Sequence, residues 1–154
     1  MPVSIFAMLL FATCTWLGAG VVEPVMRDFA AEVGIRTWVF VAIPGLLSAL
    51  FSLLLYRNAA ARIPGVEQSM SRALVVGILT WLAVSAMVGT LWCPDDRTLS
   101  CGSGVLVVTG IVGGGPLLAA VLIAGFIVGV LLKRRVPWLA YEPPPPRVIE
   151  GHAD

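Results

Sequence analysis

The residues best suited to chemistry lie in one short stretch, CPDDRTLSC, which begins at Cys93 and ends at Cys101. Two thiols eight positions apart can close a disulfide-bonded loop in an oxidising compartment. The same stretch supplies Asp95 and Asp96, which add carboxylate donors for a metal ion. The spacing matches neither a zinc hairpin nor a helical ligand pair, and we therefore predict no metal site. The pattern favours a Cys93–Cys101 disulfide over two unpaired thiols or a redox-active pair.

Catalysis by this stretch would need partners that the sequence does not place beside it. A redox-active pair would need a second dithiol on the same side of the membrane. Residues 23–36, which the topology predicted below places on that side, contain no cysteine. Asp95, Asp96 and Arg97 have no neighbouring histidine and no nucleophile beside a base. The chain has no phosphate loop, serine elbow or HExxH motif. We therefore expect no catalytic residue and no enzyme.

Cofactor ligands are equally scarce. The single histidine, His152, lies in the polar C-terminal segment. A haem between two helix histidines, or a histidine-based metal site, would need imidazoles that the rest of the chain lacks. A net charge of +1 excludes the strong positive field of a nucleic-acid binder. We expect no cofactor, no metal and no nucleic-acid partner.

The elements that must carry these residues are long uncharged runs. The chain is 58% hydrophobic and 12% charged, whereas a soluble domain averages roughly 45–50% and 25%. Residues 105–132 contain 28 residues without a charge, and three similar runs precede them. Only a bilayer stably solvates such runs. We predict an all-α integral membrane bundle within residues 1–135, with four transmembrane helices at about 3–22, 37–56, 73–92 and 105–132.

The first two predicted spans and the segment between them leave some alternatives open. The first run lacks the basic residues of a signal peptide, so a span is favoured over cleavage near Leu17–Gly20. Residues 23–36 have apolar residues near helical spacing, with Pro24 for a first turn and Gly34 as a stop. We predict a short amphipathic helix in the interface there; a partner-docking or gating helix is the alternative. Trp38 and Tyr56 flank the second span as interfacial aromatics.

Proline interrupts two of the predicted spans. Pro44 lies inside the second span, and Pro116 follows three glycines in the fourth. Proline cannot donate a backbone hydrogen bond and its ring crowds the preceding turn, so we predict a kink at each position. At about 1.5 Å per residue the fourth run would reach ~42 Å, which exceeds the ~30 Å hydrocarbon core. A tilt or a break at residues 113–116 would absorb the excess.

Glycines in the fourth span form two GxxxG pairs. At about 100° per residue they fall within a sector of roughly 100°. Such a stripe lets two helix backbones touch, which replaces the hydrophobic drive that lipid removes. We expect the stripe to pack against the chain's own helices, with a subunit interface as the alternative. The stripe comprises Gly110, Gly114, Gly125 and Gly129.

Basic residues divide unequally between the two sides of the predicted bundle. Six occupy the second connection and the start of the tail, and three occupy the first and third connections: Arg57, Arg62, Arg72, Lys133, Arg134 and Arg135 against Arg27, Arg36 and Arg97. The positive-inside rule then places both termini in the cytoplasm of a bacterial plasma membrane. Lys133, Arg134, Arg135 and Trp138 form an interfacial anchor. Residues 136–154 are expected to be a flexible proline-rich cytoplasmic tail.

The predicted spans contain no Asp, Glu, Lys, Arg or His, so they offer no proton relay or ion-pair switch. We therefore expect a small non-catalytic accessory or scaffold subunit that packs through glycine-rich helix faces. Its partners would be the lipid bilayer and either another membrane protein or a second copy. The alternative is a small transporter or channel-like oligomer, with the kinked second and fourth helices lining the path.

Overall fold

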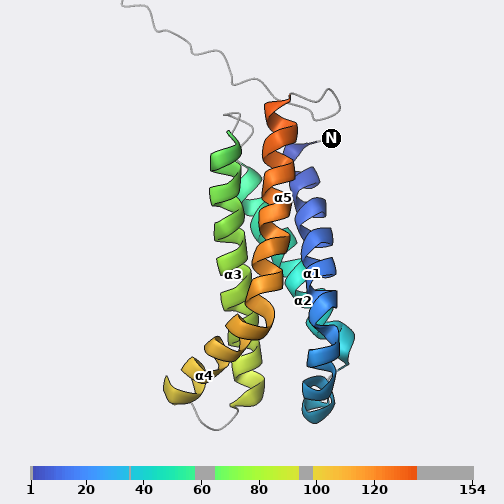
Figure 1. Cartoon of the computed structure of the whole chain (residues 1–154), viewed down its shortest axis with the longest axis vertical. Helices are drawn as coiled ribbons and strands as arrows, with labels where there is room; N and C mark the ends of the chain where they lie inside the picture. The colour runs from blue at the N-terminus through green and yellow to red at the C-terminus, as the bar shows by residue number, and fades with distance from the viewer. Residues whose placement is uncertain (1, 35, 58–64, 94–98, 135–154) are drawn as a thin grey trace, which may run out of the picture.

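The computed structural model describes residues 2–34, 36–57, 65–93 and 99–134. Every element in these ranges is helical (Figure 1). The elements are α1 (Val3–Val33), α2 (Thr37–Arg57), α3 (Val66–Trp92), α4 (Leu99–Thr109), the π-helical turn η2 (Gly110–Gly114) and α5 (Gly115–Lys133). The predicted tail at 136–154, with Arg135 and Trp138 of the anchor, lies outside the described residues, as do Asp95, Asp96, Arg97 and His152.

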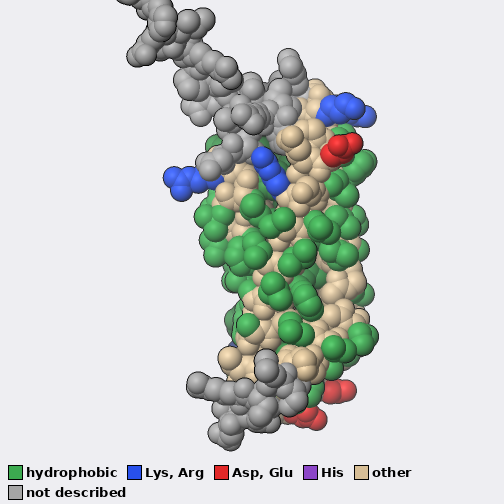
Figure 2. All heavy atoms as spheres, turned by 90° about the vertical axis from the view of Figure 1, so that its left-hand side faces the viewer, with side chains coloured by type: hydrophobic (Ala, Val, Ile, Leu, Met, Phe, Trp, Pro, Cys, Tyr) green, Lys and Arg blue, Asp and Glu red, His purple; other side chains and the backbone are tan. Residues whose placement is uncertain are grey.

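Four helical stretches are long and apolar enough to cross a bilayer, which confirms the predicted fold class. Hydrophobic side chains cover the middle of the molecule, and the charged ones gather towards its two ends (Figure 2). The fourth stretch combines α4, η2 and α5. The stretches run over Val3–Asp28, Thr37–Arg57, Val66–Trp92 and Cys101–Lys133.

The predicted separate helix after the first span is wrong, because α1 continues unbroken from Val3 to Val33 with Pro24 inside it. The reason is packing: Ala30, near the end of α1, is buried against Phe40 of α2. The last turns of α1 therefore have a helix to pack on and do not turn away. Gly34 ends α1 as predicted, in the left-handed region with φ 73°.

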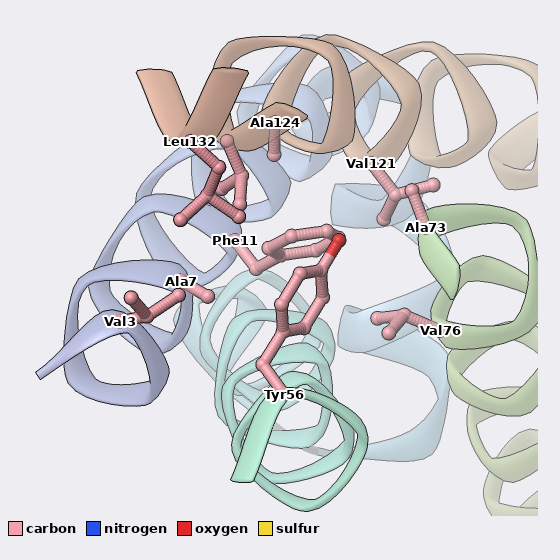
Figure 3. Packing of buried hydrophobic residues seen from close by; sticks show 10 residues of the cluster. Val3, Ala7, Phe11, Tyr56, Ala73, Val76, Val121, Ala124 and Leu132 are labelled. Carbon is pink, nitrogen blue, oxygen red and sulfur yellow. The ribbon is translucent and has the colours of Figure 1, made fainter. Parts of the chain in front are cut away.

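The helices form a closed ring in which α1 packs on α2, α2 on α3, α3 on α5 and α5 on α1. The main core lies at the end of the bundle where α1 begins and α5 ends (Figure 1). There the rings of Phe11 and Tyr56 lie with centroids 5.8 Å apart, beside small residues of α3 and α5 (Figure 3). A second, smaller cluster lies towards the other end, made of Ala30, Phe40, Val88 and Val105.

The fourth span changes its helical pitch at the glycines that precede Pro116. The π-helical turn η2 occupies Gly110–Gly114, and Pro116 lies in the first turn of α5. Pro116 has no N–H for the carbonyl of Val112 and its ring would crowd that carbonyl in a regular helix, so a wider turn relieves both problems. By contrast, α2 is a single helix through Pro44.

Adding one methyl group at Gly125 should destabilise the bundle. A Cβ atom at Gly125 would overlap the Cβ of Ala73 and lie 3.2 Å from the Ser69 carbonyl oxygen. We expect Gly125→Ala to lower the free energy of unfolding by about 1–3 kcal/mol, as overpacking does. The matched control is Gly115→Ala, since a Cβ there meets nothing within 4 Å. Equal thermal unfolding of the two variants in detergent would contradict the packing described above.

Candidate functional site

Several buried hydroxyl groups of the bundle join neighbouring helices. Between α1 and α2, the Thr15 hydroxyl donates to Ser48 Oγ at 2.9 Å. The Ser48 hydroxyl in turn donates to the carbonyl oxygen of Phe11 at 3.5 Å. All the hydroxyl oxygens of this chain of contacts lie inside the protein. Because lipid offers them no alternative partner, such bonds hold membrane helices in register.

Ser69 joins three helices at a single point. Its hydroxyl donates to the carbonyl oxygen of Gly125 on α5 at 2.8 Å. The hydroxyl of Tyr56 on α2 donates towards Ser69, with its oxygen 3.1 Å from the carbonyl oxygen and 2.9 Å from Oγ. The guanidinium of Arg72 lies over the Tyr56 ring, 5.6 Å from its centroid. Tyr56 is therefore a core residue, 1% exposed, and its prediction as an interfacial aromatic is wrong.

Ser85 and Thr109 join α3 to the end of α4. Their hydroxyl oxygens are 2.7 Å apart. Thr109 donates to the carbonyl oxygen of Val105 at 2.9 Å, so Ser85 is the donor within the pair. Thr109 immediately precedes η2, and this bond therefore holds the start of the π-helical turn against α3.

A cavity of about 70 Å³ lies between α1 and α2 on one side and α3 and the fourth span on the other. The cavity lies beyond the main core along the bundle and reaches the second cluster, because Phe40 and Val88 belong both to that cluster and to the lining. The lining is mostly apolar. It comprises Gly18, Ala19, Val22, Glu23, Met26, Phe40, Val41, Pro44, Trp81, Val84, Val88, Thr109, Gly113 and Leu117.

Trp81 provides the unusual polar group of this cavity. Its indole ring lies against Gly110, where an added Cβ would be 3.6 Å from the ring. Its Nε1–H is buried and has no hydrogen-bond partner among the described residues. Glu23 also lines the cavity, but its carboxylate accepts from Arg27 at 3.3 Å and its side chain is 43% exposed. Glu23 therefore lies where the cavity meets the surroundings.

The four predicted stripe glycines do not share one environment. Gly125 and Gly129 both face α3, and a Cβ at Gly129 would lie 3.0 Å from the Cα of Val66. Gly110 also faces α3, through the Trp81 ring, whereas near Gly114 the closest atom is the Thr109 carbonyl oxygen of its own span. Gly114, inside the π-helical turn, is therefore the stripe glycine that does not face α3.

Other residues singled out in the sequence lie apart from one another. Cys93 and Cys101 are at disulfide-bonding distance, with Cα atoms 6.6 Å apart, and they connect the end of α3 to α4. Pro44 lines the cavity. Lys133 and Arg134 are exposed at the end of α5. Within the described ranges, no group of three or more histidine, cysteine or acidic side chains could hold a metal ion.

Sequence reasoning missed the pairing of Trp81 with the cavity and the role of Ser69. A tryptophan in the middle of an uncharged run was the only available signal for Trp81, and it fits a packing residue equally well. Ser69 stands near the start of α3, where a serine more often caps the helix. The partner that distinguishes it, Gly125, is 56 positions away.

These observations define a class: the chain is a small multi-pass membrane protein, made of four apolar helices joined by hydroxyl and glycine contacts. Comparison with protein-family models, with curated proteins and with solved structures gives no match to it.

Removing the Ser69 hydroxyl should weaken the contact of three helices. We expect Ser69→Ala to lower the free energy of unfolding by about 1–2 kcal/mol, since interhelical hydrogen bonds in membranes contribute up to about 1.7 kcal/mol each. Ser71→Ala is the control, because Ser71 is exposed on the same helix. Equilibrium unfolding in mixed micelles measures both. A double-mutant cycle with Tyr56→Phe should show coupling, and strict additivity would contradict the described network.

Proposed function

We propose that this chain is a non-catalytic accessory or scaffold subunit of a bacterial plasma membrane. The observation that carries the proposal is the use of most of its buried hydroxyls: those of Thr15, Ser48, Ser69, Ser85 and Thr109 each bond to a hydroxyl or carbonyl of the helix bundle. The buried hydroxyl of Thr80 is the exception, with no partner among the described residues. Most hydroxyls that could act as nucleophiles are thus employed in assembling the bundle. A rigid bundle with apolar outer faces is suited to holding another membrane protein.

The outer faces of the helices offer the surface for such a partner. Large apolar side chains point outwards on every spanning stretch, among them Leu46 on α2, 70% exposed, and Ile111 in η2, 78% exposed. Gly125 and Gly129 are already covered by α3, so a partner would use another face. Gly115, at the start of α5, remains open, since it is exposed and a Cβ there meets nothing within 4 Å.

Photo-crosslinking can locate the partner. A photoreactive amino acid at Ile111, and separately at Leu46, would probe the outer faces of the fourth span and of α2. A scaffold subunit should give a protein adduct of one defined mass from one of these faces only, with the other face as the control. Adducts to lipid alone from both faces, in the native membrane, would contradict the proposal.

A small transporter or channel-like oligomer is the second candidate, and one observation favours it. The cavity is lined both by Pro44 of α2 and by Gly113 of η2, so the two proline-containing spans contribute to the same space, and the fourth span is interrupted there by the π-helical turn. Interrupted helices that line a cavity are typical of transporters. Crosslinks to a second copy alone, together with solute flux through the purified protein in liposomes, would favour this candidate over the scaffold.

We further propose that both termini face the cytoplasm. At the end of the bundle where α1 begins, α2 ends, α3 begins and α5 ends (Figure 1). Four basic residues lie near these helix ends: Arg57, Arg72, Lys133 and Arg134. The positive-inside rule supports a cytoplasmic position for this end of the bundle. The Cys93–Cys101 pair would then face the oxidising side.

Cysteine labelling of intact cells tests this orientation. An impermeant maleimide should modify Cys93 and Cys101 only after treatment with an impermeant reductant, because the thiols are paired. In a variant with Lys133→Cys, the new thiol should react only after the cells are permeabilised. Labelling of the Lys133→Cys thiol in intact cells would show the opposite orientation.

A further inference from the structure

From the cavity and its buried donor we propose that this protein binds an apolar molecule carrying a ketone- or quinone-type carbonyl, whose oxygen accepts a hydrogen bond from Trp81 Nε1. This site goes beyond the proposed scaffold role. The first observation is the donor itself: Trp81 Nε1 is buried and has no partner among the described residues, and the Trp81 side chain is part of the cavity lining. An indole N–H can only donate, so the missing group is an acceptor.

The lining selects against water as the occupant. A buried water typically makes about three hydrogen bonds, whereas most of the lining side chains here are aliphatic or aromatic. The Thr109 hydroxyl already bonds to Ser85 and to the Val105 carbonyl oxygen. The Glu23 carboxylate is paired with Arg27 at the exposed end. A water beside Trp81 would therefore find too few partners, while an apolar molecule with one acceptor would match both the donor and the walls.

The depth of Trp81 indicates which kind of carbonyl can reach it. Trp81 lies fifteen residues after the start of α3 at Val66 and eleven before its end at Trp92. These separations correspond to roughly 22 Å and 16 Å along the helix axis. Phospholipid ester groups lie in the interfacial regions, outside the ~30 Å hydrocarbon core. The acceptor therefore belongs to a molecule that dissolves in the core itself, and not to an ordinary membrane lipid.

Local backbone geometry keeps the site open. The π-helical turn places Gly113 on the cavity wall, and a Cβ there would meet nothing within 4 Å. A larger side chain at this position would enter the cavity without first displacing a neighbour. At Gly110 the missing side chain lets the Trp81 ring approach the helix. The glycines of η2 thus provide both the space and the position of the donor.

Binding of a defined probe tests the proposal. The probe is a benzoquinone with a decyl chain, titrated by calorimetry into the full chain in detergent, and decylbenzene is the acceptor-free comparison. We expect saturable binding of the quinone by the wild-type protein. Trp81→Phe keeps an aromatic wall but removes the donor, and should raise the Kd of the quinone by roughly two- to tenfold while leaving decylbenzene unaffected.

The controls separate the cavity from general partitioning into detergent. Gly113→Leu should abolish binding of both probes, whereas Gly115→Leu, at an exposed glycine two residues along, should bind as the wild type does. Thermal unfolding of each variant shows whether it is folded. If wild type and Gly113→Leu bind the quinone equally, or if Trp81→Phe weakens both probes alike, the proposal is overturned. Absence of any saturable binding by the wild type overturns it as well.

Discussion

The close approach of α3 and α5 is the contact on which the rest of this structure depends. Lipid is as apolar as the helix surfaces, so exclusion of water cannot hold the helices together. Gly125 and Gly129 bring the backbone of α5 against Ser69 and Val66, and the Ser69 hydroxyl then reaches the Gly125 carbonyl oxygen at 2.8 Å. A larger residue at Gly125 would separate the two backbones and remove this bond at the same time.

Tyr56 extends this contact to α2 and defines one tightly packed end of the bundle. Its ring packs on Phe11 of α1, and its hydroxyl binds Ser69 of α3. Small residues such as Ala73 and Ala124 surround it (Figure 3). Beyond this end the helices leave the cavity between them, with Phe40 and Trp81 among the side chains that line it. The bundle therefore combines a tightly packed end with a more open middle.

The fourth span links these two regions through η2. Its first part, α4, is held to α3 by the Cys93–Cys101 pair and by the bond between Ser85 and Thr109. Its second part, α5, packs on both α1 and α3. Figure 1 shows α4 directed away from the axis of α5. The fourth span therefore contributes α5 to the tightly packed end and lines the cavity with residues at the π-helical turn.

The sequence by itself determined the class of fold, the number of spans and the stop at Gly34, because each depends on local chemistry: long uncharged runs need lipid, and a glycine readily adopts positive φ. Only the tertiary structure decided which faces meet. Tyr56 as a core residue, the continuation of α1 past Glu23, the different neighbours of Gly110 and Gly125, and the unpaired donor of Trp81 all depend on another helix. In a soluble protein the polar side of a helix would have indicated its outer face. Here core and lipid are both apolar, so the sequence contains little contrast between the inner and outer faces, and only the packed bundle distinguishes them.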